Sequence, residues 1–318
     1  MKCRVDLITG FLGSGKTTFL RQYAKHFIDK GERICILEND YGAVNVDLML
    51  LKDLISEKCD METVAGGCDA DCHKRRFKTK LIAMGMQGFD RVIIEPSGVF
   101  DMDEFFDTLR EDPLDRWYEI GSVIAIVDAT LPDELSKASE YMLSSQVACA
   151  GRIILSHTDE CAGEPEDSVS RILSHLNRSL KTIGCDRTIE AGSVMAGDIR
   201  ALLPDKIEAV SASGYYMADY RKLYFADDAG FGSVYIMNCD LKKEDIPGLT
   251  ERLFSDEKYG KVYRIKGFVR DGNNWLEVNA VKKGIEIKPV SEGQDIIIVI
   301  GEDLDFSAEE LGFKPKNK

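Results

Sequence analysis

Short apolar runs alternate with longer amphipathic stretches over the first half of the chain. The runs at 5–9, 33–38, 91–95, 122–129 and 152–156 are rich in Val, Ile and Leu and are bounded by turn residues. Runs of this kind are typical of strands buried on both faces, and helical stretches between them favour parallel pairing. The pattern predicts an α/β domain in which helices cover a mostly parallel sheet.

The stretch after the first run has the spacing of an amphipathic helix. Its apolar residues fall on one side of a helical projection: Phe19, Leu20, Tyr23, Ala24, Phe27 and Ile28. Lys30 and Gly31 are typical of a helix end. We therefore expect a helix that packs one apolar stripe against the sheet.

Strict alternation of apolar and polar residues replaces the continuous runs beyond residue 214. It is clear at 233–238, 261–266 and 274–279, and a helical pattern covers 246–254. Alternation indicates strands with one packed face and one wet face. We predict a smaller α+β domain with an antiparallel sheet. The expected boundaries are 1–210 for the first domain, 211–230 for a linker region and 231–318 for the second domain.

The composition indicates which partners the protein is unsuited to bind and in which compartment it is expected. The chain has 41 Lys and Arg against 55 Asp and Glu, a net charge of -14, which disfavours broad contact with nucleic acid or an anionic membrane. We find no apolar run long enough for a membrane span, so a cytoplasmic protein is expected. Nine cysteines, an odd number, argue against a disulfide framework and favour small buried thiols.

A phosphate-binding loop follows the first predicted strand directly. Residues 10–17 match the GxxxxGK[ST] spacing, in which backbone N–H groups surround a β-phosphate, the Lys reaches the β and γ oxygens and the hydroxyl ligates magnesium. The required context, a strand before and a helix after, is predicted for this segment. The candidate binding residues are Gly10, Gly13, Ser14, Gly15, Lys16, Thr17 and Thr18.

Acidic residues end several of the predicted parallel strands. Ligands of open α/β sheets bind at the carboxyl ends of strands, where Glu38, Glu95 and Asp128 fall. Glu95 is a candidate ligand of magnesium or of the attacking water, and Gly98 offers a backbone amide to the γ-phosphate. For Asp128 a solvated strand end is an equal alternative.

Six segments together resemble the CobW-type GTPases, in the larger set that contains the nickel-insertion proteins HypB and UreG. The segments span nearly the whole chain: GFLGSGKTT at 10–18, ENDYGAVNVD at 38–47, GGCDADC at 66–72, IEPSG at 94–98, QVACAGRIILSHTD at 146–159 and YRIKG at 263–267. The resemblance implies a P-loop GTPase domain followed by a CobW-like C-terminal domain, with GTP or GDP and magnesium as ligands.

The resemblance also assigns roles to single residues. It makes ENDYG the first switch, with Asp40 or Asp47 near the γ-phosphate or its attacking water, and IEPSG the second switch. Asp159 would accept hydrogen bonds from guanine. Ser156 and His157 stand where the family has Asn and Lys, so we expect looser selectivity for guanine.

The loop at 66–72 departs from the family, which has Cys-x-Cys-Cys there. Cys68, Cys72 and His73, with the carboxylates of Asp69 or Asp71, supply enough donors for zinc, cobalt or a related transition metal. However, five consecutive side chains do not all point one way. The alternative is a switch loop with two unligated cysteines.

Two functions from different classes follow. The first is a magnesium-dependent GTPase of low turnover that acts as a metallochaperone or metal insertase, with a client metalloprotein bound through the C-terminal domain. The second is a nucleotide-gated switch of protein assembly that carries no metal. A small-molecule kinase is disfavoured because ENDYG and HTD would then have no purpose. The resemblance leaves the oligomeric state open, a nucleotide-dependent dimer included.

Overall fold

The computed structural model describes residues 2–40, 51–65, 70–98, 100, 102–161, 165–223, 231–282 and 284–313. The chain divides by its internal contacts into two units, Met1–Leu223 and Tyr224–Lys318. Each unit is built around a sheet of its own. The described part of the chain contains no helix with the length and apolar character needed to cross a bilayer.

The first unit contains a parallel sheet, as the apolar runs predict. Neighbouring strands are parallel at every described pairing. In spatial order the described strands are β3 (Cys59–Ala65), β2 (Ile34–Asp40), β4 (Arg91–Pro96), β1 (Cys3–Thr9), β5 (Tyr118–Asp128), β6 (Arg152–Ser156) and β7 (Val194–Ala196). The central strand β1 therefore lies between β4 and β5, and it is the strand that leads into the phosphate-binding loop.

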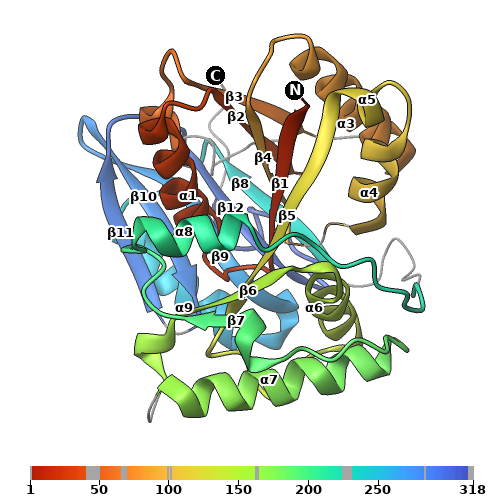
Figure 1. The fold of residues 1–318 in the computed structure, drawn as a ribbon. Coiled ribbons are helices and arrows are strands. Elements are labelled where there is room, and N and C mark those ends of the chain that lie inside the picture. The colour runs from red at the N-terminus through yellow and green to blue at the C-terminus, as the bar shows by residue number, and fades with distance from the viewer. Residues whose placement is uncertain are drawn as a thin grey trace. The chain divides into compact units, whose positions relative to one another are not determined.

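Helices cover both faces of this sheet, which confirms the α/β class. Helices α1 and α8 contact each other on one side of β1 and β5, and α4 and α5 lie on the other side (Figure 1). The helices of the unit are α1 (Lys16–Lys30), α3 (Ala70–Gly85), α4 (Met102–Arg110), α5 (Leu114–Trp117), α6 (Lys137–Cys149), α7 (Pro165–Thr182) and α8 (Pro204–Ser211), with short 3-10 turns at Lys52–Leu54, Thr158–Glu160 and Ala191–Ser193.

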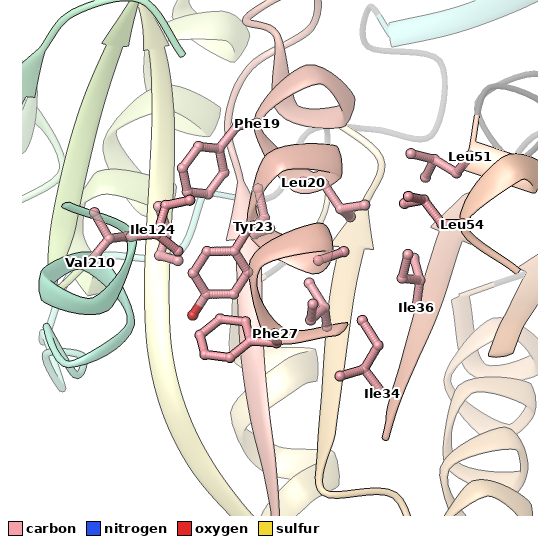
Figure 2. Close-up of a cluster of buried hydrophobic side chains, with 14 of the residues drawn as sticks. Phe19, Leu20, Tyr23, Phe27, Ile34, Ile36, Leu51, Leu54, Ile124 and Val210 are labelled. Atoms are coloured by element: carbon pink, nitrogen blue, oxygen red, sulfur yellow. The ribbon is translucent and has the colours of Figure 1, made fainter. Parts of the chain in front are cut away.

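The apolar stripe of α1 is buried as predicted. Phe19, Tyr23 and Phe27 are at most 1% exposed and point toward Ile124 and Val210 (Figure 2). On the other flank of the helix, Leu20 lies toward β2 and the 3-10 turn that follows it. The helix ends at Lys30, and Gly31 takes a left-handed conformation at its C-cap. This packing fixes the N-terminus of α1 relative to β1.

A buried carboxylate ties the elements around β1 together. Asp6, with no exposed surface, accepts hydrogen bonds from the Tyr23 hydroxyl of α1 at 2.9 Å and from the Ser122 N–H of β5 at 2.7 Å. It also pairs with Arg91 of β4 and with Arg4. A buried charge is tolerated when it is paired and hydrogen-bonded in this way. The side chain of Asp6 thus links β1 to α1, β4 and β5.

The second unit contains an antiparallel sheet, as the alternation predicts. All its described strand pairs are antiparallel. The order is β11 (Gly284–Val290), β10 (Asn274–Val281), β9 (Lys261–Asp271), β12 (Ile296–Glu302) and β8 (Phe231–Met237). Helix α9 (Asp245–Ser255) contributes Ile246, Leu249 and Leu253 to the hydrophobic cluster of this unit. A 3-10 turn at Glu257–Tyr259 precedes β9.

Residues 214–223, inside the predicted linker, belong to the first unit and contact its other elements. The Tyr215 ring lies 5.3 Å from the Phe106 ring, and the Tyr216 N–H donates to the Cys149 carbonyl at 3.0 Å. The Arg221 N–H donates to the Ile183 carbonyl at 2.7 Å. This stretch of chain is therefore packed along α4 and the end of α6.

Candidate functional site

The loop between β1 and α1 has the backbone that phosphate binding requires. Gly13 and Gly15 have φ of 79° and 89°, in the left-handed region that favours glycine. At Gly10 a Cβ would lie 2.2 Å from the Ile126 carbonyl oxygen, so a side chain does not fit. The loop ends at the N-terminus of α1, where free backbone N–H groups and the helix dipole favour an anion.

The charged and hydroxyl groups of the loop are held close to it. Lys16 is 7% exposed, and its Nζ donates to the Gly10 carbonyl at 3.1 Å. The Thr17 hydroxyl donates to Glu95 Oε1 at 2.9 Å, which joins the loop to the end of β4. The Ser14 hydroxyl is buried and has no hydrogen-bond partner among the described residues. The predicted Lys, Thr and Glu therefore do come together.

A second carboxylate lies beside Glu95. Glu38 of β2 pairs in register with Glu95 of β4, and the two side chains are 3% and 4% exposed. The backbones of register partners on adjacent parallel strands are about 4.8 Å apart, and their side chains point to the same face of the sheet. The two buried acids therefore lie side by side on one face, at the carboxyl ends of β2 and β4. Together with the Thr17 hydroxyl they form a set of oxygen donors, which is the chemistry that Mg²⁺ prefers. The residues present fit a magnesium ion.

The glycine of the predicted second switch touches the phosphate-binding loop. A Cβ at Gly98 would lie 2.8 Å from the Leu12 backbone nitrogen. On its other side, Gln146 of α6 donates from Nε2 to the Gly98 carbonyl at 2.9 Å. In the first predicted switch, Asp40 is the last residue of β2. Asp47 lies outside the described residues.

The predicted base-recognition segment follows β6. His157 has φ of 52°, and its Nδ1 lies 3.3 Å from Asp128 Oδ2. Burial raises the pKa of the Asp128 carboxyl, but hydrogen bonds from His157 and Thr130 outweigh burial and hold this pKa below its ordinary value. Asp159 is exposed, and Arg200 Nη2 lies 3.4 Å from its Oδ2. The segment thus presents a carboxylate with an arginine from the loop after β7 beside it.

The predicted transition-metal ligands are only partly described. Cys68 lies outside the described residues, and Cys72 is partly buried near the start of α3. His73 has no exposed surface, and its Nδ1 lies 3.3 Å from Glu104 Oε1 of α4. Successive helix residues point about 100° apart, so Cys72 and His73 face different directions. The described residues contain no cluster of three or more metal-ligating side chains.

Several other cysteines are poor candidates for metal ligands. Burial raises the pKa of Cys59 to about 11 and that of Cys3 and Cys149 to about 12, and it raises the pKa of Cys35 further. A metal ligand must be a thiolate, and these groups stay protonated at neutral pH.

These raised pKa values predict the reactivity of the thiols. With iodoacetamide at pH 8, Cys35 and Cys149 are expected to react about a thousandfold more slowly than an unperturbed thiol, because little thiolate forms and both are buried. Mass spectrometry of the native protein checks this, with urea-unfolded protein as the control. Alkylation of both at the rate of the unfolded protein would contradict the prediction.

A parallel sheet whose central strand runs through GxxxxGK[ST] into a helix, with acids at the neighbouring strand ends, defines a P-loop nucleotide-binding protein. The chain belongs to the CobW/HypB/UreG family, since the profile of that family's nucleotide-binding domain matches residues 4–184.

Curated relatives span bacteria and a eukaryote. The chain is 34% identical over 178 residues to the zinc chaperone YjiA of Escherichia coli K12, an alignment that covers 53% of each protein. It is 24% identical to zinc-regulated GTPase metalloprotein activator 1 of Schizosaccharomyces pombe, over 94% of this chain and 82% of that protein. In the alignment with YjiA, the chain spans about half the length of that bacterial relative.

Among solved structures, the chain is similar to the crystal structure of Zn(II)-bound YjiA GTPase from E. coli. The match covers 98% of this chain and 97% of that chain, with 22% identity and a TM-score of 0.40.

Proposed function

We propose that this chain is a magnesium-dependent GTPase that couples its nucleotide cycle to the handling of zinc. The observation that carries the proposal is the Thr17–Glu95 hydrogen bond, because it connects the phosphate-binding loop to the acid of the strand that leads into the second switch. Support comes from family membership and from relatives named as zinc chaperones and as a zinc-regulated GTPase metalloprotein activator.

Positioning and electrostatics account for hydrolysis. The loop amides and Lys16 would hold the β and γ phosphates, and Thr17 and Glu95, with Glu38 beside them, would hold Mg²⁺. When bound, Mg²⁺ neutralises charge on the phosphate oxygens. Gly98 offers its N–H to the γ-phosphate. Asp40 and Asp47 remain the proposed groups near the attacking water, and turnover is expected to be low.

Guanine is the proposed base. The exposed carboxylate of Asp159 is suited to accept hydrogen bonds from the guanine N1 and N2 groups, and the His157 ring replaces the alkyl stem of a lysine as the stacking surface. Arg200 competes for the same carboxylate. We therefore propose that GTP is preferred over ATP by a smaller factor than in a protein with an intact NKxD segment.

Zinc is the proposed cargo, with Cys68, Cys72 and His73 as its proposed ligands and cobalt as an alternative ion. The segment lies between the two switches in sequence, so movement of the switches on hydrolysis would change the ligand geometry. One contact favours a second candidate function, an assembly switch without metal. His73 Nδ1 bonds Glu104, and a ring nitrogen that makes this bond does not ligate zinc.

One titration tests the proposal. Metal-free full-length protein with Mg-GDP or with the β,γ-imido analogue of GTP is titrated with Zn²⁺, and phosphate release from GTP and ATP is followed without any acceptor. Zinc affinity is expected to differ about tenfold between the nucleotides, through linkage of the two sites. The difference should vanish in the double variant Cys68→Ala, Cys72→Ala.

Cys239→Ala is the matched control, since Cys239 is a partly exposed thiol of the second unit. Unchanged zinc affinity in the double variant would rule out the proposed ligands. Nucleotide binding and hydrolysis without any zinc effect would favour the assembly switch. Absence of GTP hydrolysis in the wild-type protein would end the enzymatic proposal.

We also propose a cytoplasmic location and a client metalloprotein that docks on the C-terminal domain at 231–318, after a GTPase domain at 1–210 and a linker region at 211–230. Support comes from the net charge of -14, which disfavours nucleic acid and anionic membranes as partners, and from the separate sheet of the second unit. A dimer that forms with nucleotide fits the same scheme.

A further inference from the structure

Helix α6 carries a buried amide that reaches out of its own helix. Gln146 has no exposed surface, and its Nε2 donates to the Gly98 carbonyl at 2.9 Å. The neighbouring hydroxyls of Ser144 and Ser145 instead bond carbonyls of α6 itself, at Glu140 and Met142. Because a carbonyl oxygen only accepts, its contact fixes which end of the Gln146 amide faces the second switch.

The two polar atoms of the Gln146 amide differ in their hydrogen bonding. Gln146 Oε1 is buried and has no hydrogen-bond partner among the described residues. Burying an amide oxygen without a partner costs free energy that an apolar side chain of the same size would not cost. A polar residue at this position is therefore explained better by its contact with Gly98 than by packing.

Gly98 is held from two sides. Leu12 of the phosphate-binding loop lies so close that a Cβ would be 2.8 Å from its backbone nitrogen, and Gln146 holds the carbonyl from α6. Ser97, the residue before it, is fixed by the bond from its N–H to the Asn39 carbonyl at 2.8 Å. The Gly98 N–H itself makes no hydrogen bond to the described residues. Gly98 thus lies beside the phosphate-binding loop.

We propose that Gln146 is a positioning residue: by holding the Gly98 carbonyl it limits rotation of the backbone at Gly98 and so keeps the N–H of that residue, which belongs to the preceding peptide unit, where it meets the γ-phosphate. Gln146 thereby sets the preference for GTP over GDP. GDP lacks the γ-phosphate, so its binding does not use this N–H. The inference rests on the proposed GTPase function. It assigns to α6, outside the two switches, a part of the discrimination between substrate and product.

Gln146→Met tests the proposal, because methionine has a similar length and donates no hydrogen bond. The ratio of the Kd for Mg-GDP to the Kd for the Mg-bound β,γ-imido GTP analogue is expected to fall about five- to tenfold, the worth of one hydrogen bond. The Kd for GDP should stay within about twofold. The kcat for GTP should fall at least about tenfold, since the γ-phosphate is misplaced.

Ser144→Ala is the matched control, a buried polar residue of the same helix whose bond stays within α6. Gln146→Asn, which keeps the amide but is one carbon shorter, is the second variant in case the methionine disturbs folding. Concentrations are counted as GDP-binding sites, so a partly unfolded sample does not alter the ratio.

A lower melting temperature with an unchanged ratio in either variant would overturn the proposal, because it would mean a purely structural role. A higher ratio would overturn it as well. Equal affinity of the wild-type protein for both nucleotides would also overturn this proposal, because there would be no preference to set, whereas absence of GTP hydrolysis in the wild-type protein would end the proposed function instead. These outcomes are distinguishable from each other in the same set of measurements.

Discussion

Lys16→Ala is expected to weaken the binding of both GTP and GDP by about 10²–10³-fold. The Nζ of Lys16 is buried next to the Gly10 carbonyl, where its charge meets the phosphate oxygens with little screening by water. Removing one partner of a buried, hydrogen-bonded charge pair costs about 2–5 kcal/mol of binding free energy. Calorimetric titration with Mg-GDP and with the β,γ-imido GTP analogue measures the loss.

Lys25→Ala is the matched control, since Lys25 is an exposed lysine of the same helix. Its nucleotide affinity should equal that of the wild type within about twofold. The melting temperature of the Lys16→Ala protein without nucleotide should not fall, because the variant removes a buried charge. Wild-type affinity in Lys16→Ala would refute the assignment of the phosphate site.

Gly98→Ala is expected to reduce GTP hydrolysis by about 100-fold or more while GDP still binds. The added Cβ would lie 2.8 Å from the Leu12 backbone nitrogen and 2.7 Å from Leu12 Cδ2, so the backbone on one side must move. A displacement of about 1 Å at a reacting centre costs about 10²-fold in rate. Single-turnover phosphate release and GDP titration separate chemistry from binding.

Gly192→Ala serves as the control, because nothing lies within 4 Å of a Cβ there and its φ is not positive. It should behave as wild type in both assays. If Gly98→Ala hydrolysed GTP at the wild-type rate, then Gly98 would not take part in binding the γ-phosphate. A loss of GDP binding as large as the loss of hydrolysis would also contradict the prediction.

In the parallel sheet, the strands that the sequence predicts well are those buried on both faces. β4 (RVIIEP), for example, is buried along its whole length, and its centre is an apolar run of Val and Ile. The edge strand β3 has the sequence CDMETVA, in which acidic residues interrupt the apolar ones, and the sequence pattern predicts no strand there. β7 has three residues, too few for a pattern. Edge strands and short strands take their structure from pairing rather than from local hydrophobicity.

The phosphate-binding loop is predictable because its chemistry is local in sequence. The sequence places Glu38 only at a strand end; its position beside Glu95 depends on the register of β2 against β4. Likewise, the contacts of Gln146 with Gly98 and of Arg200 with Asp159 join residues more than 40 positions apart. No periodicity or spacing in a single sequence encodes such pairs, although a glutamine at a fully buried helix position is a signal that a search for buried polar residues would find.

The bonds of Asp6 limit how this region of the protein can change in evolution. Asp6 and Arg91 lie on adjacent strands, and both are almost completely buried. Losing either one alone leaves the other buried charge with one ionic partner fewer, Arg4 remaining for Asp6 and Glu32 for Arg91, which is costly in the interior, whereas replacing both with apolar residues leaves neither of these buried charges to be paired. Each single substitution therefore gives a destabilised protein, whereas the double substitution does not. The two positions are epistatic, and in descendants of this sequence they should be kept together or lost together.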